Sequence, residues 1–190
     1  MIEKSIKDSI DTKQKILDNK ALLNTVQEVA DQMVSVFEND GKVLLCGNGG
    51  SAADAQHLAA ELSGRFYYDR PPLFAEALHV NTSYLTAVAN DYSYDEIFAR
   101  LVKAKGRKGD MLFCLSTSGN SKNILRAIKV ADEIGMITVG FTGESGGAMK
   151  QACEYLVNVP SNDTPRIQEA HILLGHVVCE IVESTLFPKS

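Results

Sequence analysis

The sequence has no tryptophan, only five prolines, and no apolar run long enough to cross a membrane. Its first residues, Met1 to Ser5, lack the apolar stretch of a secretory signal peptide. The four cysteines are scattered singly, with no Cys-x-x-Cys pair among Cys46, Cys114, Cys153 and Cys179. These absences predict a cytoplasmic protein whose cysteines are buried, reduced thiols.

Positive charge is also scarce. The chain has 19 lysines and arginines against 24 aspartates and glutamates, which gives a formal net charge of −5. No basic cluster stands out, so nucleic acid and anionic membranes are poor partners. A phosphorylated ligand must then be held mainly by neutral donors. With 190 residues, 45% of them apolar and 23% charged, the chain fits one globular domain.

Strands and helices alternate after the first forty residues, which are themselves predicted to be helical. Short apolar strands are predicted at 42–46, 75–80, 111–115, 136–141 and 155–159. Helices are predicted at 51–63, 82–89, 95–103, 121–134 and 164–186. This alternation predicts an α/β fold with a parallel sheet covered on both faces. Ligands of such sheets bind beyond the carboxyl ends of the strands.

The last predicted helix is apolar in nearly every direction, and such a helix must be buried all round. One small domain covers only part of it, so we expect it to pack against other subunits. We interpret residues 1–190 as a single domain. Within it, residues 1–40 are helices of an oligomer core and residues 41–190 are the sheet domain.

A hydroxyl-rich loop follows the third predicted strand and opens a helix: Ser116-Thr117-Ser118-Gly119-Asn120-Ser121. Hydroxyls and backbone N–H groups donate hydrogen bonds, and a helix N-terminus adds partial positive charge. An ordinary helix cap needs one hydroxyl, not four. The loop is therefore predicted to cradle a phosphate.

A glycine-rich loop follows the first predicted strand: Cys46-Gly47-Asn48-Gly49-Gly50-Ser51-Ala52. It matches the dinucleotide pattern Gly-x-Gly-x-x-Gly/Ala, so a nicotinamide enzyme has to be considered. That pattern also requires an acid at the end of the second strand, where this chain has His79-Val80-Asn81. A second polar clamp on a sugar is the better interpretation.

A metal or acid–base site is a further possibility. His57 and Glu61 are four residues apart and share one helix face. On the last helix, Gln168, His171 and His176 interrupt the apolar run. Imidazole, carboxylate and amide groups of this kind can bind Zn²⁺, although a solvated helix face is the common alternative for such spacing.

Gln168 and His176 lie eight residues apart, roughly 12 Å along a helix axis. Zinc ligands lie within about 4 Å of one another. We therefore hypothesise that a shared site takes Gln168 and His176 from different subunits, or does not use both. Asn90-Asp91 either binds sugar hydroxyls or simply ends a helix, and the sequence favours neither.

Together these segments resemble the sugar isomerase (SIS) domain family over nearly the whole chain. The resemblance rests on the two loops, His57-Leu58-Ala59-Ala60-Glu61, Ser63-Gly64-Arg65, Asn90-Asp91, Arg166-Ile167-Gln168-Glu169 and His176. It implies a three-layer α/β/α sandwich with a five-stranded parallel, flavodoxin-like sheet, and a homotetramer with sites between subunits. The implied reaction converts sedoheptulose 7-phosphate to D-glycero-D-manno-heptose 7-phosphate, for lipopolysaccharide or capsule.

The resemblance also implies ligands. It implies one zinc per subunit at His57, Glu61, Gln168 and His176. It implies that the sugar phosphate contacts Asn48, Gly49, Gly50, Ser51, Glu61, Asn90, Asp91, Ser116, Thr117, Ser118, Ser121 and Gln168.

Moving a carbonyl from C2 to C1 passes through an enediol and needs a base and an acid. Our hypothesis gives these roles to Glu61 and His176. Two alternatives stay open: isomerisation of another sugar phosphate, and a non-catalytic SIS protein that binds a replication initiator. The tail Ser184-Thr185-Leu186-Phe187-Pro188 resembles that second branch.

Overall fold

The computed structural model describes residues 1–189 and contains one five-stranded sheet. The strands are β1 (Val43–Gly47), β2 (Ala75–Ala77), β3 (Met111–Leu115), β4 (Ile137–Thr142) and β5 (Tyr155–Asn158). Every neighbouring pair is parallel, and the order is β2-β1-β3-β4-β5. This is the flavodoxin-like order. The predicted sheet is confirmed, although β2, an edge strand, ends at Ala77 rather than at residue 80.

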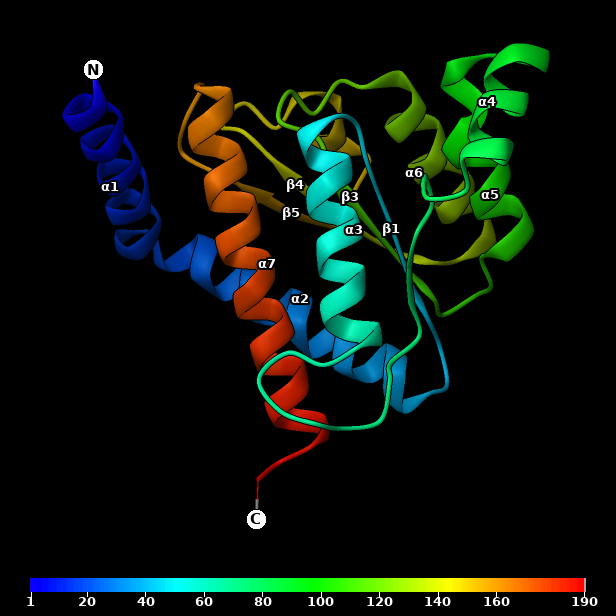
Figure 1. Cartoon of the computed structure of the whole chain (residues 1–190), viewed down its shortest axis with the longest axis horizontal. Coiled ribbons are helices and arrows are strands. Elements are labelled where there is room, and N and C mark those ends of the chain that lie inside the picture. Colours follow the sequence, from blue (N-terminus) through cyan, green and yellow to red (C-terminus); the bar gives the residue numbers. More distant parts are fainter. Residues whose placement is uncertain (190) are drawn as a thin grey trace.

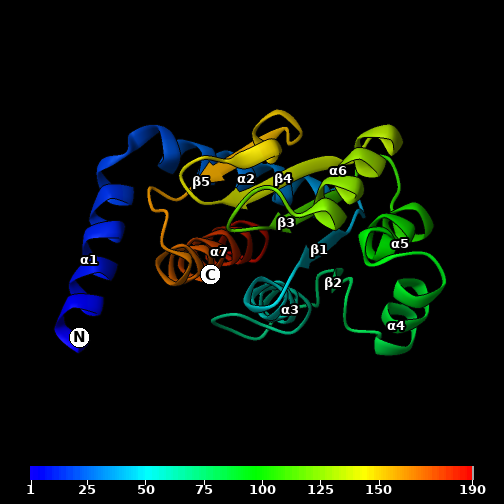
Figure 2. The same ribbon diagram turned by 90° about the horizontal axis from the view of Figure 1, so that it is seen from above.

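Helices cover both faces of the sheet, as Figures 1 and 2 show. One face carries α2 (Lys20–Glu38), α3 (Gly50–Ser63) and α7 (Thr164–Leu186). The other carries α4 (Thr82–Asp91), α5 (Ile97–Lys105) and α6 (Lys122–Ile134). Two short 3₁₀ helices span Tyr94–Glu96 and Gly147–Gln151. The predicted three-layer α/β/α sandwich is therefore confirmed.

The central strands are buried on both sides, which explains their continuous apolar runs. Successive side chains of a strand point to opposite faces. Leu45 and Phe113 accordingly join the core under α2, α3 and α7, whereas Leu44 and Leu112 join the core under α4, α5 and α6. Burial also raises the pKa of Cys153 and Cys179 to about 12, so these thiols stay protonated.

The first forty residues form two helices, as the sequence predicted. Between α1 (Ile2–Asp18) and α2, the side chain of Asn19 accepts a hydrogen bond from the N–H of Leu22 and so caps α2. Helix α1 projects from the sheet domain at one side of Figure 1. More than half of the surface of each of four apolar residues on it is exposed: Ile2, Ile6, Ile10 and Leu17.

Helix α7 is buried along one side only within a single chain. Leu174, Val178 and Val182 face the core, whereas Leu173 on the outer side remains 39% exposed. No helix within residues 1–189 combines the length and the apolar character that crossing a membrane requires. The burial of α7 by other subunits stays a prediction.

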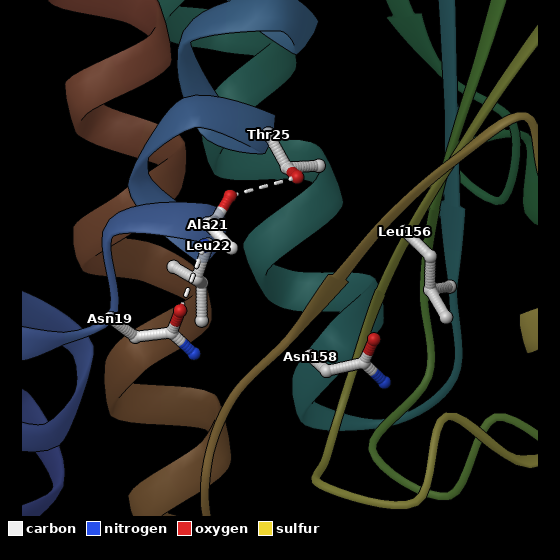
Figure 3. Close-up of a pocket in the computed structure, with 6 residues that line it drawn as sticks. All are labelled: Asn19, Ala21, Leu22, Thr25, Leu156 and Asn158. Carbon is white, nitrogen blue, oxygen red and sulfur yellow. Dashed lines mark hydrogen bonds between the residues drawn. The ribbon is translucent and has the colours of Figure 1, made fainter.

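A cavity of about 210 Å³ lies between the start of α2 and strand β5 (Figure 3). Its lining consists of Asn19, Ala21, Leu22, Thr25, Leu156 and Asn158. None of these side chains titrates near neutral pH, and none belongs to the site predicted from the sequence. This cavity offers no carboxylate, imidazole or thiol for catalysis.

Candidate active site

The glycine loop (residues 46–52) and the serine loop (residues 116–121) meet at the carboxyl edge of the sheet. They follow β1 and β3, which are paired neighbours with Gly47 opposite Leu115. The chain order reverses between these two strands, so this is the switch point at which ligands of such folds bind. Each loop also opens a helix, α3 or α6.

A cavity of about 90 Å³ lies between the two loops, and we call it the loop cavity. This volume is well above the roughly 10–15 Å³ that a cavity needs in order to hold one water. It is lined by Asn48, Ser51, Leu115, Ser116, Thr117, Ser121 and Gln168. Six of the predicted substrate-binding residues therefore come together around one small polar space.

Ser121 stands at the N-cap of α6, but its hydroxyl makes no capping hydrogen bond. The hydroxyl instead lies 3.1 Å from the hydroxyl of Ser116. A serine used only as a cap would accept a bond from the first turn of the helix. Ser121 is therefore free to donate to a ligand at the positive end of α6.

The rest of the serine loop bends away from the loop cavity. Gly119 has φ +64°, and a Cβ there would collide with the backbone of Gly146, so only glycine fits. Ser118 is exposed, lines a neighbouring cavity of about 270 Å³ and accepts a hydrogen bond from the N–H of Asn120. Its own hydroxyl proton remains available, and its contact with a phosphate stays a prediction.

Gly50 shows why the glycine loop ends in glycines. A Cβ on Gly50 would lie 2.5 Å from Nε2 of Gln168, so a larger residue would displace the glutamine. Gly49 is exposed and a Cβ there would meet no other atom, but its φ of +56° favours glycine. Asn90 and Asp91 lie exposed at the end of α4 and bond to each other at 2.9 Å. Their contact with a sugar stays a prediction.

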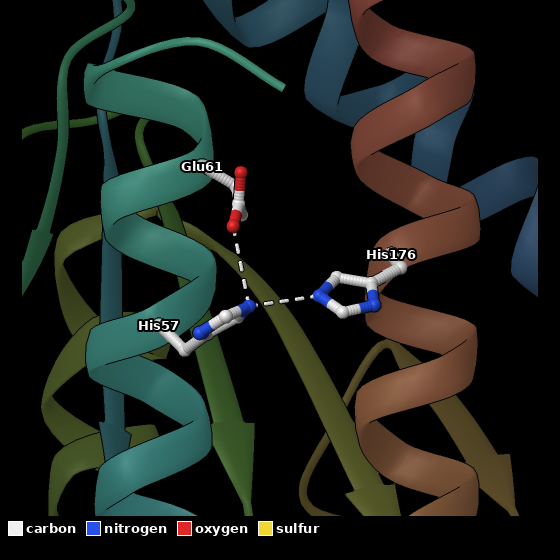
Figure 4. Close-up of side chains that lie close together, drawn as sticks. All are labelled: His57, Glu61 and His176. Atoms are coloured by element: carbon white, nitrogen blue, oxygen red, sulfur yellow. Dashed lines mark hydrogen bonds and ion pairs between the residues drawn. The ribbon is translucent and has the colours of Figure 1, made fainter. Parts of the chain in front are cut away.

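His57, Glu61 and His176 form a second group, which we call the acid–base cluster. Figure 4 shows His57 and Glu61 on α3 pointing toward α7, from which His176 points back. Nε2 of His57 lies 2.9 Å from Nε2 of His176 and 3.2 Å from Oε1 of Glu61. The structure thus joins residues that the sequence could only suggest as partners.

The acid–base cluster is open to solvent on one side. The side chain of His57 is 50% exposed and that of Glu61 is 24% exposed, so a substrate can reach both. Burial lowers the pKa of His176; the nearby His57 acts in the same direction and Glu61 opposes it. A neutral ring at pH 7 can both donate and accept a proton.

The donor atoms of the cluster fit a zinc ion. One atom from each residue lies within 4.8 Å of the other two. Tetrahedral bonds of about 2 Å separate neighbouring donors by roughly 3.3 Å, so small side-chain rotations suffice. Two histidines and one glutamate are also a donor set that zinc enzymes use with a fourth position open.

The loop cavity and the acid–base cluster lie along the same pair of helices. Gly50 and Gln168 lie next to the loop cavity, at the starts of α3 and α7. His57 and His176 lie seven and eight residues further on, or roughly 10 to 12 Å along the helix axes. Because Gln168 lines the loop cavity in this chain, its role as a fourth metal ligand stays a prediction.

A buried ion pair beside the cluster was not predicted from the sequence. Nε of Arg70 donates to Glu183 at 3.1 Å, and each side chain is 2% exposed. Arg70 also donates to the backbone oxygens of Glu61 and Leu62, so it holds the end of α3. An arginine between Asp69 and Pro71 gives no signal of such a role, because its partner is 113 residues away.

The SIS domain profile matches residues 7–143, which is more than half of the chain. The fold, the two loops and this match define a SIS domain protein. Among curated proteins, the chain is 50% identical to a phosphoheptose isomerase of Aneurinibacillus thermoaerophilus, covering 98% of this chain and 94% of that one. A phosphoheptose isomerase of Clostridium acetobutylicum is 53% identical over 98% of this chain and 95% of its own length.

Solved structures agree with these relatives. A phosphoheptose isomerase from Neisseria gonorrhoeae superposes with a TM-score of 0.90 at 44% identity, over 96% of this chain and 97% of that one. One from Francisella tularensis gives 0.92 at 39% identity, over 96% of each chain. The chain belongs to the phosphoheptose isomerase family of SIS domain proteins.

Proposed function

We propose that the protein is an aldose–ketose isomerase that interconverts sedoheptulose 7-phosphate and D-glycero-D-manno-heptose 7-phosphate. One observation carries the proposal. A small polar cavity lined by hydroxyls and an acid–base cluster lie on the same two helices, in a chain half identical to phosphoheptose isomerases. The roughly 10 to 12 Å between them suits six C–C bonds of about 1.5 Å and a phosphoester group.

The serine loop holds the phosphate of the substrate. Ser116, Thr117 and Ser121 donate from the loop cavity, and Ser118 donates from the neighbouring cavity, which Thr117 also lines. Because the donors are neutral, the positive end of the α6 dipole supplies the electrostatic attraction. The other end of the open-chain sugar then extends along α3 and α7. Asn48, Gly49, Gly50, Ser51, Asn90, Asp91 and Gln168 complete the proposed sugar contacts.

Glu61 and His176 move the protons. The Glu61 carboxylate removes a proton from C1 while His176 donates one to the carbonyl oxygen on C2, which gives the enediol. His176 then takes the proton from the oxygen on C1, and Glu61 returns its proton to C2. The ketose becomes the aldose, and both residues regain their starting protonation states.

His57, Glu61 and His176 are the residues that would hold one zinc ion per subunit, and the proposed fourth ligand is Gln168 of a neighbouring subunit. Bound zinc would supply a positive charge that stabilises oxygen charge developing in the reaction. A carboxylate has two oxygens, so Glu61 can keep one free for proton transfer.

We further propose a homotetramer with active sites between subunits. The exposed isoleucines of α1 and the exposed Leu173 of α7 support it, because large exposed apolar patches are typical of contact surfaces. Residues 1–40 would then form an oligomer core and residues 41–190 the sheet domain of a single 1–190 unit. The proposed setting is the cytoplasm, in heptose synthesis for lipopolysaccharide or capsule.

One assay tests the reaction. The protein, stripped of metal and then supplied with or without zinc, is incubated with sedoheptulose 7-phosphate, and formation of the aldose is followed. Aldose formation by the wild-type protein that is lost in the Glu61→Gln variant supports the proposal. No product under either condition contradicts it and favours a binding module, such as one that contacts a replication initiator.

A further inference from the structure

Asn123 lies in the first turn of α6, behind the loop cavity rather than in its lining. Its side chain is 3% exposed, although asparagine is among the residues that proteins mostly keep at the surface. A buried amide needs hydrogen-bond partners for both its oxygen and its nitrogen. The partners of Asn123 show what this residue does.

Asn123 and Asn48 form a reciprocal amide pair across the two loops. Nδ2 of Asn48 donates to Oδ1 of Asn123 at 3.0 Å, and Nδ2 of Asn123 donates to Oδ1 of Asn48 at 2.9 Å. The hydroxyl of Tyr94 also donates to Oδ1 of Asn48, at 3.2 Å. Asn48 lines the loop cavity, so Asn123 fixes one wall of that cavity from outside.

Asn123 has a second effect on the serine loop. Its Oδ1 accepts the backbone N–H of Ile124 at 3.0 Å. Ile124 is the third residue after the N-cap Ser121, the position whose N–H a capping serine usually binds. Because Asn123 takes that N–H, the hydroxyl of Ser121 can stay in the loop cavity.

We propose that Asn123 is a positioning residue for phosphate binding: it holds Asn48 in the cavity wall and leaves the Ser121 hydroxyl available to the ligand. The proposal rests on the proposed function for its substrate. Asn123 belongs neither to the lining of the loop cavity nor to the acid–base cluster. Its removal must therefore act through Asn48 and Ser121, and it must affect binding more than turnover.

The test uses the full chain and two readouts. Binding of inorganic phosphate is measured by ³¹P line broadening, and kcat and KM are measured with sedoheptulose 7-phosphate. The variants are Asn123→Ala, Asn48→Ala and the double variant. Asn123→Ala is expected to raise the phosphate Kd and the KM roughly 5- to 30-fold, since buried partners lose their bonds. We expect kcat to stay within about threefold, as loss of uniform binding predicts.

The sharper criterion is whether the effects of the two single variants on Kd and KM combine independently in the double variant. If Asn123 acts largely through Asn48, the double variant is much less impaired than the product of the two single effects predicts. Effects that multiply independently would overturn the proposal, as would an Asn123→Ala protein with unchanged Kd and KM. Lys129→Ala, an exposed change on the same helix, is the matched control and should leave both constants unchanged.

Asn123→Ser covers the case in which the alanine variant does not fold. Its side chain is too short to reach Asn48, so the same rise in Kd is expected; an unchanged Kd would overturn the proposal. Failure of the proposed function gives a different pattern. The wild-type protein would then make no aldose, while inorganic phosphate binding would still respond to Asn123 and Asn48 in the non-additive way.

Discussion

The serine loop is built from six consecutive residues, whereas the acid–base cluster joins His57 to a residue 119 positions away. The loop is held by a local turn and the start of α6, and also by distant backbone, since the N–H groups of Gly143 and Met149 donate to the oxygens of Thr117 and Gly119. The cluster depends on how α3 packs against α7. The comparison teaches that the donors of the proposed anchor can be recognised from consecutive residues, whereas the proposed proton-transfer groups are brought together only by tertiary packing.

The largest expected effect is on the chemistry. Glu61→Gln and His176→Gln should each lower kcat by roughly 10²- to 10⁴-fold, because each removes a proton-transfer group. Steady-state kinetics with sedoheptulose 7-phosphate measures this. Glu180→Gln, an exposed change one turn beyond His176, is the control and should retain wild-type kcat. Near wild-type turnover in both variants, with folding intact, would contradict the assignment of Glu61 and His176 as the proton-transfer residues.

The packing that supports the cluster is tested next. Burial acts to raise the pKa of Glu183, but N–H bonds from Tyr67 and Phe66 and the contact with Arg70 outweigh it, so the pKa is lowered. Arg70→Met would leave that carboxylate buried without its cation. It should lower the free energy of unfolding by about 3–5 kcal/mol, measured by urea denaturation.

A matched surface pair calibrates that result. Lys4 and Asp8 form an exposed ion pair one helical turn apart on α1. Lys4→Met should leave stability unchanged, because solvent screens exposed pairs. Equal losses in the Arg70 and Lys4 variants would mean that the buried pair does not hold α3 against α7.

His171 lies on α7 between Gln168 of the loop cavity and His176 of the acid–base cluster. It contacts the backbone oxygen of Thr142 at 3.2 Å. Burial lowers the pKa of His171 to about 4 from the ordinary value of 6.5. As the pH falls, His171 therefore binds a proton in the unfolded chain at a higher pH than it does in the folded chain. His171 leaves the free energy of unfolding unchanged above about pH 6.5, and its protonation in the unfolded chain lowers that free energy by roughly 3 kcal/mol as the pH drops to about 4.

Urea denaturation at a series of pH values measures this loss. His171→Gln has no group that titrates in this range and should show a flatter profile between pH 6.5 and pH 4 than the wild type. Profiles of equal slope would show that His171 is not kept neutral by the fold.

The smallest expected effects are in the anchor. Ser121→Ala and Ser118→Ala should each raise KM by roughly 3- to 10-fold, the value of one hydrogen bond, with little change in kcat. Ser184→Ala, an exposed hydroxyl near the end of α7, is the control and should leave KM unchanged. A fall in kcat without a rise in KM would mean that the serine loop takes part in the chemistry.

The sequence predicted most of the fold because its signals are local. The strand at 111–115 and the helix at 164–186 have the predicted bounds. The position of the break at Asn19 and the 3₁₀ helix at 94–96 were not predicted, since each depends on a few turn residues within a helical pattern. Contacts between distant segments were also missed: Arg70 with Glu183, and Asn123 with Asn48. No periodicity links such partners.

The candidate site divides in the same way. The two loops could be recognised from consecutive residues, and His57 with Glu61 from helical spacing. Spacing alone did not separate His171 from His176 on the last helix, whereas the resemblance to the SIS family singled out His176. The structure places His176 in the cluster and buries His171 completely, because α7 turns one side toward α3 and another toward the sheet.

The central claim is that the serine loop binds the phosphate while the acid–base cluster moves the protons. Its most direct test compares two substrates that differ only in the phosphate. Aldose formation is measured from sedoheptulose 7-phosphate and from unphosphorylated sedoheptulose, with the same wild-type protein. An anchor in the serine loop predicts that kcat/KM falls by roughly 10²-fold or more without the phosphate. Equal kcat/KM for the two sugars would contradict the account.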